Sequence, residues 1–363
     1  MARDHYKLFS EGRIRELRLP NRLVRSATWD PIILNRREMV ADVLVIYRDL
    51  AAGGVGLVIT GGLNVYRESE PGSSEPPGKT YGYPDLRVAG IEKLPETVHG
   101  QFRDCKVIAQ LETGYLDAGP SDYPSPYRSE PLRALSVGEI EDIVAAFVHA
   151  IVDMHAAGFD GVQLHAAHGG LLSAFLSPYT NRRGDQYGGS VQNRVRIVRE
   201  IVAASRARVG DFPILIKLNG TDYLPGGIDQ DNLPSLVKEV VEAEIDAVEI
   251  SGGMWECLAR PESELGFRPV PSPESHTRIR PPDRQSYFLK YASQLDIGIP
   301  VILVGGNRNV ERMEEIVSQN QADFIAMSRP LIREPDLPDR WREGRGARRG
   351  RSVFRRVLEY QHG

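Results

Sequence analysis

The stretch PVILVGGNRNVERMEEIVSQNQADFIAMSRP, residues 300–330, places two short apolar runs on either side of an amphipathic segment. The runs at 300–305 and 323–328 hold no charge beyond the leading Asp323, which is typical of parallel strands buried on both faces. The segment between them, 309–321, repeats its apolar residues at the spacing of a helix. The stretch therefore predicts a strand–helix–strand unit of a parallel sheet.

Six further runs of the same kind occur earlier in the chain, separated by helix-type segments. They span residues 22–27, 56–60, 106–111, 161–165, 213–218 and 247–251. The best-marked helix begins after Ser136, which forms a capping box with Glu139, and ends at Gly158. Eight strands with intervening helices fit a closed (β/α)8 barrel or a doubly wound open sheet. No Gly-x-Gly-x-x-Gly turn follows the first strand, so the barrel is favoured.

Length and loops agree with a barrel. Two domains of about 150 residues would suit 363 residues, but so does one barrel, a fold that runs from about 200 to more than 400 residues. We expect one domain over residues 1–363, with long loops at 62–83 and 252–284 and an arginine-rich tail from about residue 339. A helix is predicted at 283–295. Loops at the carboxyl ends of barrel strands carry active sites, although they can also be surface decoration.

Composition excludes several classes of protein. Lys and Arg number 45 against 49 Asp and Glu, a net charge of −4 that argues against a basic, nucleic-acid-coating surface. With two cysteines, Cys105 and Cys257, one chain can form neither a disulfide framework nor an all-cysteine metal cluster. The first ten residues carry charge where a signal peptide would be apolar, and no uncharged apolar run reaches about 18 residues. We expect a cytoplasmic protein without nucleic-acid or membrane partners.

Two loops near the end of the chain point to a phosphate group. Gly305 and Gly306 follow the seventh strand, and Ser328 and Arg329 follow the eighth. At this end of a barrel, backbone N–H groups freed by glycine and an arginine bind phosphate. The alternative is a pair of tight-turn glycines and a salt-bridged arginine.

Two histidines stand three residues apart where the fourth strand ends, His165 and His168. Both can point into the barrel mouth, where they could hold a metal or donate hydrogen bonds to an anionic oxygen. A zinc site needs a third ligand, and no Cys, Asp or Glu is placed for it nearby, so no metal is predicted. The structural alternative is that both histidines only form hydrogen bonds within their own loop.

The segment HAAHGGLLSAFLSPYTNRRGDQYGGSVQNRVRIV, residues 165–198, resembles the signature of the Old Yellow Enzyme family of flavin-dependent oxidoreductases. Similar matches occur at the other strands, before and after this segment. They are NRLVRSAT, GGVGLVITGG, AQLETG, IKLNGTDYLPGGI, EISGG, VGGN and DFIAMSRPLIREPDLP. The resemblance implies an FMN-binding barrel that is reduced by NADH or NADPH and passes a hydride to an activated alkene, an enone or enal. Larger relatives carry a cysteine cluster that this chain lacks, so no iron–sulfur cluster is expected.

The same resemblance assigns roles position by position. The FMN phosphate would lie on Gly305, Gly306, Ser328 and Arg329. The flavin ring would contact Ser26, Ala27, Thr28, Gly61, Gly62, Gln110 and Lys217, with Thr28 near O4, Gln110 at the pyrimidine edge and Lys217 beside N1 and O2. A positive charge there stabilises the anionic reduced flavin. His165 and His168 would bind the carbonyl oxygen of the substrate.

Two departures from the family pattern lie at the substrate end. Gly170 replaces the tyrosine that protonates the substrate, and Thr113 replaces a frequent histidine. The chain's own proton donor is therefore open among Asp30, Tyr81, Tyr83, Tyr179 and water. Two other functions stay open: a flavin dehydrogenase or desaturase working in the oxidative direction, and a flavin-binding sensor without efficient turnover. The natural acceptor and the choice between NADH and NADPH also stay open.

Two groups of residues outside the site are assigned provisional roles. Asp185, Asn193 and Arg194 are predicted to tie their loop to the following helix. The tail holds eight arginines: Arg340, Arg342, Arg345, Arg348, Arg349, Arg351, Arg355 and Arg356. They suit a solvated face paired with acids, a contact in a homo-oligomer or, less well with the acidic balance, a nucleic-acid patch.

Overall fold

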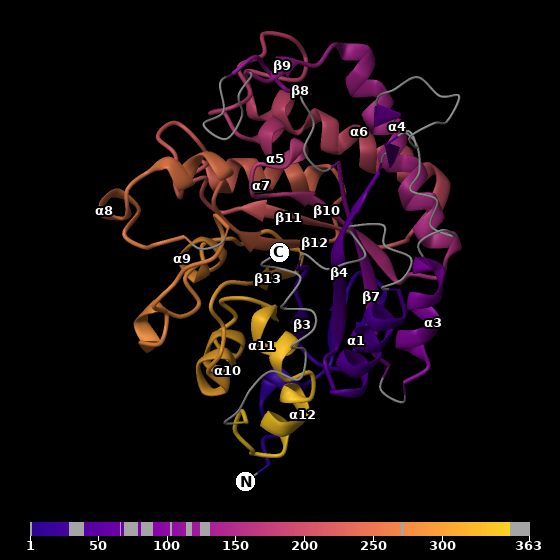
Figure 1. Cartoon of the computed structure of the whole chain (residues 1–363), viewed down its shortest axis with the longest axis vertical. Helices are drawn as coiled ribbons and strands as arrows, with labels where there is room; N and C mark the ends of the chain where they lie inside the picture. Colours follow the sequence, from indigo (N-terminus) through magenta and orange to yellow (C-terminus); the bar gives the residue numbers. More distant parts are fainter. Residues whose placement is uncertain are drawn as a thin grey trace.

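The computed structural model describes residues 2–28, 40–65, 67–68, 79–80, 90–101, 104–113, 118–123, 131–269 and 272–348. Its centre is a closed barrel of parallel strands (Figure 1). The strands are β3 (Leu23–Arg25), β4 (Leu57–Asn64), β7 (Lys106–Glu112), β10 (Gly161–Ala166), β11 (Ile214–Asn219), β12 (Ala247–Ser251), β13 (Val301–Leu303) and β14 (Phe324–Met327). Each pairs with its neighbour in chain order, and β14 closes the barrel against β3. The predicted (β/α)8 barrel and its eight strands are confirmed.

A hairpin closes the amino-terminal end of the barrel. Strands β1 (Gly12–Ile14) and β2 (Leu17–Leu19) pair antiparallel. Ile14 and Leu19 are fully buried and pack in one apolar cluster with inward side chains of the barrel strands. Arg15, in the turn, reaches Asp246 at 3.0 Å, just before β12 begins. This end of the barrel is therefore sealed by apolar packing.

Amphipathic helices cover the outside of the barrel (Figure 1). The longer ones are α1 (Val40–Ala52), α4 (Val137–Ala156), α6 (Val191–Val209), α7 (Leu233–Glu242) and α10 (Val310–Ser318). The shorter ones are η1 (Lys7–Phe9), η4 (Ile91–Lys93), α3 (Leu94–His99), α5 (Leu171–Leu176), η5 (Trp255–Ala259), α8 (Glu262–Leu265), η6 (Pro282–Arg284), α9 (Leu289–Ala292), α11 (Arg329–Arg333) and α12 (Leu337–Arg342). The predicted capping box of Ser136 and Glu139 opens α4.

Three pairs of short strands lie outside the barrel sheet. They are β1 with β2, β5 (Arg67–Glu68) with β6 (Lys79–Thr80), and β8 (Ala118–Gly119) with β9 (Arg133–Ala134). None of the helices in the described ranges has the length and apolarity that a bilayer span requires.

The helix predicted at 283–295 is wrong for most of its length, because only α9 (Leu289–Ala292) and the end of η6 form there. Ser286 adopts a left-handed backbone, with φ at 50°, and its hydroxyl donates to Asn307 Oδ1 at 2.7 Å. This bend interrupts helical hydrogen bonding. It also turns Tyr287 and Phe288 against the loop that follows β13.

The described part of the arginine-rich tail packs beside the amino terminus (Figure 1). Arg342 reaches Asp4 at 2.7 Å, while Arg345 pairs with Glu343 and Arg348 with Asp336. These pairs agree with the solvated-face hypothesis for this part of the tail. Arg349, Arg351, Arg355 and Arg356 lie outside the described residues.

Candidate active site

A chain of buried polar side chains crosses the carboxyl end of the barrel interior. Lys217 Nζ lies 3.2 Å from Glu249 Oε1 and 2.9 Å from Ser26 Oγ, and the Ser26 hydroxyl lies 2.5 Å from the same carboxylate. Gln163 donates to Glu249 Oε2 at 2.8 Å, and Gln110 donates to Gln163 at 2.7 Å. Lys217 is 3% exposed and Glu249 is fully buried. An ion pair this deep adds little net stability, so its presence favours a functional role for the cluster.

The two predicted phosphate loops lie side by side. Gly305 and Gly306 follow β13 with φ of 107° and 75°, a backbone that favours glycine. Asn307 cross-links the two strands by donating to Leu303 O at 2.9 Å and to Ala326 O at 3.0 Å. Ser328 follows β14, so the two loops open at the same end of the barrel.

Arginines surround these loops. Arg329 is the first residue of α11 and is exposed. The pKa of Arg308 is lowered by burial and by repulsion from Arg329, Arg280 and Arg333. Like charges that depress one another's protonation attract an anion, and a phosphate would relieve the repulsion.

The predicted flavin-ring loops also converge on the cluster. The pairing of β4 with β7 shifts between Ile59 and Gly62, and the Thr60 hydroxyl fills the gap by accepting from Gln110 N at 3.0 Å. Gly61 N donates to the Tyr47 hydroxyl at 3.1 Å. These contacts fix the backbone of Gly61 and Gly62 beside Gln110, at the end of β4.

The end of β3 follows the same arrangement. Ser26 N donates to Met327 O at 3.1 Å, which places residues 26–28 next to the end of β14. Thr28 Oγ1 donates to Ser26 O at 3.3 Å, and Ala27 is half-buried beside it.

His165 and His168 lie next to each other at the carboxyl end of β10. Their ring centroids are 5.1 Å apart. His168 has φ of 62°, its N–H donates to Asn219 Oδ1 at 3.1 Å, and its Nε2 lies 2.7 Å from Ser251 Oγ. His165 Nδ1 is buried and meets no hydrogen-bond partner among the described residues. A buried ring nitrogen in this condition is expected where a ligand binds.

Burial favours the neutral form of both imidazoles. Burial holds the pKa of each histidine well below its usual range, and the Lys217 charge lowers it further. A neutral imidazole donates one hydrogen bond and accepts another. In the described part of the chain, no group of three His, Cys, Asp or Glu could hold a metal ion.

The position that departs from the family pattern lies beside these rings. Gly170 is the residue before α5, and a Cβ there would meet nothing nearer than 3.5 Å. His165 Cδ2 would be 3.9 Å away. Of the alternative proton donors, Tyr179 lies against Arg182, while Asp30, Tyr81 and Tyr83 fall outside the described residues. Thr113 is buried at the end of β7.

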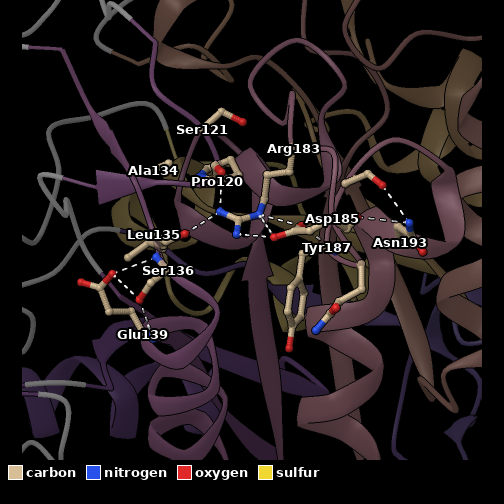
Figure 2. Close-up of polar contacts among 12 residues, drawn as sticks. Pro120, Ser121, Ala134, Leu135, Ser136, Glu139, Arg183, Asp185, Tyr187 and Asn193 are labelled. Atoms are coloured by element: carbon tan, nitrogen blue, oxygen red, sulfur yellow. Dashed lines mark hydrogen bonds and ion pairs between the residues drawn. The ribbon is translucent and has the colours of Figure 1, made fainter.

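Polar contacts tie the loop between β10 and α6 to neighbouring segments, as predicted (Figure 2). Arg183 pairs with Asp185 at 2.6 Å and donates to Pro120 O at 2.8 Å and Leu135 O at 2.6 Å. Asn193 donates to Gly188 O at 2.9 Å, and Arg194 to Leu176 O at 2.9 Å. These contacts brace the backbone of the loop.

Sequence reasoning missed four polar residues of the site: Gln163, Glu249, Ser251 and Glu112. Gln163 and Glu249 were visible as polar letters inside the otherwise apolar runs GVQLH and AVEIS. Glu112 stands next to Thr113 in AQLETG, in the motif that already departed from the family.

The fold and this site define a (β/α)8-barrel enzyme with its site at the carboxyl ends of the strands. A sequence model of the NADH:flavin oxidoreductase / NADH oxidase family matches residues 7–347. The chain belongs to this family of flavin-dependent, NAD(P)H-linked enzymes. The predicted family is confirmed by this match, and a solved Old Yellow Enzyme homologue from Zymomonas mobilis, 22% identical with a TM-score of 0.70 over 96% of this chain and 95% of that one, shares the barrel fold.

Individual relatives differ in length. NADH oxidase of Thermoanaerobacter brockii is 31% identical over 355 residues, which are 93% of this chain and 51% of that protein. NADPH dehydrogenase of Listeria monocytogenes serotype 4a is 30% identical over 344 residues, 91% of this chain and 92% of that protein. A solved complex of 2-naphthoyl-CoA reductase with 2-naphthoyl-CoA is 26% identical, with a TM-score of 0.76, covering 93% of this chain and 52% of that one. The chain thus spans about half the length of some relatives.

Proposed function

We propose that this protein is an FMN-dependent NAD(P)H oxidoreductase that reduces a carbon–carbon double bond conjugated to a carbonyl group. The observation that carries the proposal is the pair of histidines, His165 and His168, with ring centroids 5.1 Å apart, beside a buried polar cluster centred on Lys217. The family match supports the flavin and the nicotinamide donor. A relative named 2-naphthoyl-CoA reductase, solved with its conjugated thioester, supports the acceptor class.

The residues present fit FMN. The glycine pair and the repelling arginines around Arg329 suit its phosphate, and the buried ammonium of Lys217 suits the ring edge that becomes negative on reduction. Gln110, Thr28 and the backbone at 26–27 and 61–62 would hold the ring. When bound, the flavin would supply the hydride. With only Cys105 and Cys257, both buried, we propose that no iron–sulfur cluster takes part.

The histidines would act on the acceptor. Hydrogen bonds from neutral imidazoles to the carbonyl oxygen would stabilise the negative charge that develops there, and one such donor contributes about 3–4 kcal/mol. A charged imidazolium is not needed, which agrees with the lowered pKa of both residues.

The first test is spectroscopic. The purified protein, anaerobic, is mixed with NADH and separately with NADPH, and then with cyclohexenone. We expect a yellow protein that bleaches with a nucleotide and regains its colour with the enone. Bleaching without recolouring would replace the ene-reductase proposal with the oxidative dehydrogenase or the sensor. A colourless protein that FMN cannot reconstitute would contradict all three.

A glycine substitution tests the phosphate loop. Gly305→Ala places a Cβ 2.6 Å from the buried Phe288 ring and keeps a residue at φ of 107°, so the loop must move. Strain of about 1–3 kcal/mol should weaken FMN binding on the order of 10- to 100-fold, as measured by quenching of flavin fluorescence. The matched control is Gly298→Ala, at φ of 71° with open space around its Cβ. Equal FMN affinity in the two variants would contradict the assignment of the loop.

A further inference from the structure

The proposed reduction lacks a proton donor at the usual place. Adding hydrogen across a carbon–carbon double bond requires a hydride at one carbon and a proton at the other. The chain has Gly170 where the family resemblance leads us to expect a tyrosine, and a Cβ at Gly170 would lie 3.9 Å from His165 Cδ2, in ordinary van der Waals contact. A positioned acid increases the rate about 10²- to 10⁴-fold, so another acid near the histidines would matter. The assignment of such an acid rests on the proposed function.

Glu112 is the acid that the barrel brings to this place. It ends β7, the strand next to β10, and its Oε2 lies 4.0 Å from His165 Nε2. Its main-chain carbonyl accepts from Val65 N at 2.8 Å, so its backbone is held in the sheet. Its side chain keeps 23% of its accessible surface, so it is not fully sealed from solvent.

Gly62 makes room for this carboxyl. A Cβ on Gly62 would lie 2.5 Å from Glu112 Cδ, a distance that real side chains do not tolerate. The register shift in β4 brings Gly62 opposite Gln110, two residues before Glu112. The bulge and the glycine therefore act together to seat the carboxyl between β4 and β10.

The surroundings of Glu112 keep a proton on it. No Lys or Arg of the described residues lies within ion-pair distance of its carboxyl, and burial raises its pKa from 4.5 to about 7. The titratable group that faces it from β10 is His165, whose imidazole is neutral, and the facing residues of β4, Gly62 and Asn64, do not titrate. An acid with a pKa near the working pH both holds and releases a proton readily.

We propose that Glu112 is the catalytic acid that protonates the substrate, on the carbon next to the carbonyl group held by His165 and His168. The O–H bond of the carboxylic acid breaks as the C–H bond forms at that carbon, and the electron pair for the new bond comes from the enolate of the substrate. The hydride for the other carbon, two electrons and one hydrogen, would come from a bound flavin. Water at the mouth then returns a proton to the carboxylate.

A second buried acid near the mouth is the competing candidate. Glu256, in η5, lies close to Gly169, and its carboxylate accepts from the Tyr123 hydroxyl at 3.0 Å. The structure places Glu112, and not Glu256, at 4.0 Å from a histidine of the pair. Glu256→Gln is therefore the matched variant.

The activity test compares Glu112→Gln with Glu256→Gln. Reduced enzyme is mixed with cyclohexenone, and its reoxidation rate is divided by the rate with ferricyanide, an acceptor that needs no proton on carbon. We expect this ratio to fall 100-fold or more in Glu112→Gln and less than 3-fold in Glu256→Gln. Adding Gly170→Tyr to Glu112→Gln should restore at least 10-fold. If wild-type enzyme does not react with the enone, the proposed function fails. If it reacts and Glu112→Gln keeps the wild-type ratio, only the role of Glu112 is overturned.

A second measurement needs no turnover. In flavin-free protein, infrared difference spectra between pH 5 and pH 9 should show a carboxylic acid C=O band that disappears with a midpoint near 7 and is missing in Glu112→Gln. Because the folded protein raises this pKa, the charged form destabilises the fold, so wild type loses stability relative to Glu112→Gln as pH rises from 4.5 to about 7. The urea midpoints of the two proteins should diverge in that window and run parallel above it. Two results would contradict a protonated Glu112. One is the same carboxylic acid band in wild type and in Glu112→Gln, and the other is a constant difference between their urea midpoints across the whole pH range.

Discussion

Lys217→Met should lower the free energy of unfolding by about 3–5 kcal/mol, because it leaves the fully buried carboxylate of Glu249 without its cation. Ser26 and Gln163 would still donate to that carboxylate, but they carry no charge. Urea denaturation of the flavin-free protein measures the loss. Lys238→Met is the control, since Lys238 is exposed and lies 4.0 Å from Glu242, and it should change stability by less than about 1 kcal/mol.

Restoring neutrality should recover most of that stability. The double variant Lys217→Met with Glu249→Gln removes both charges and keeps an amide where Gln163 can still bond. We expect the double variant to be more stable than Lys217→Met alone, which is the mark of a coupled pair. Additive losses in the two single variants would contradict the ion pair as described.

His165→Ala should lower kcat for enone reduction about 10²- to 10³-fold while leaving the flavin bound. The ring lies beside His168 and Glu112, whereas the glycine pair and Arg329 follow β13 and β14, so the loss should appear in the step that consumes the acceptor. Stopped-flow reoxidation by cyclohexenone measures it. The charge-transfer band that phenols induce in the bound flavin should disappear as well. His149→Ala, on the exposed face of α4, is the control.

Either of two results would contradict this role for His165. One is an unchanged phenol band in His165→Ala. The other is a loss of bound flavin as large as that of Gly305→Ala, which would make His165 part of the cofactor site.

The strands were predictable because each is a short apolar run. Such a run is typical of a parallel strand buried on both faces, so the local sequence alone indicates it. The capping box of Ser136 was predictable for the same local reason. The predicted helix at 283–295 failed because one residue, Ser286, takes a left-handed backbone to reach Asn307 across the fold. A contact 21 residues away cannot be seen in local periodicity.

The site was only partly predictable. Family motifs located the glycine pair, Gln110, Lys217 and the two histidines. Glu249 needed the closed barrel, because only closure shows that its side chain points inward toward Lys217. The place of Glu112 depended on a register shift in β4 and on a glycine 50 residues earlier, and neither has a pattern within its own stretch of sequence.

The hairpin of β1 and β2 limits how substrates and products enter and leave the barrel. Because Ile14 and Leu19 fill one end of the barrel, the interior is open only at the carboxyl ends of the strands. Every molecule that enters the site there must also leave there. A nicotinamide donor and an organic acceptor that share this one opening bind one after the other. High acceptor concentrations should therefore slow turnover by competing with the nucleotide for the oxidised protein, and raising the nucleotide concentration should relieve the inhibition.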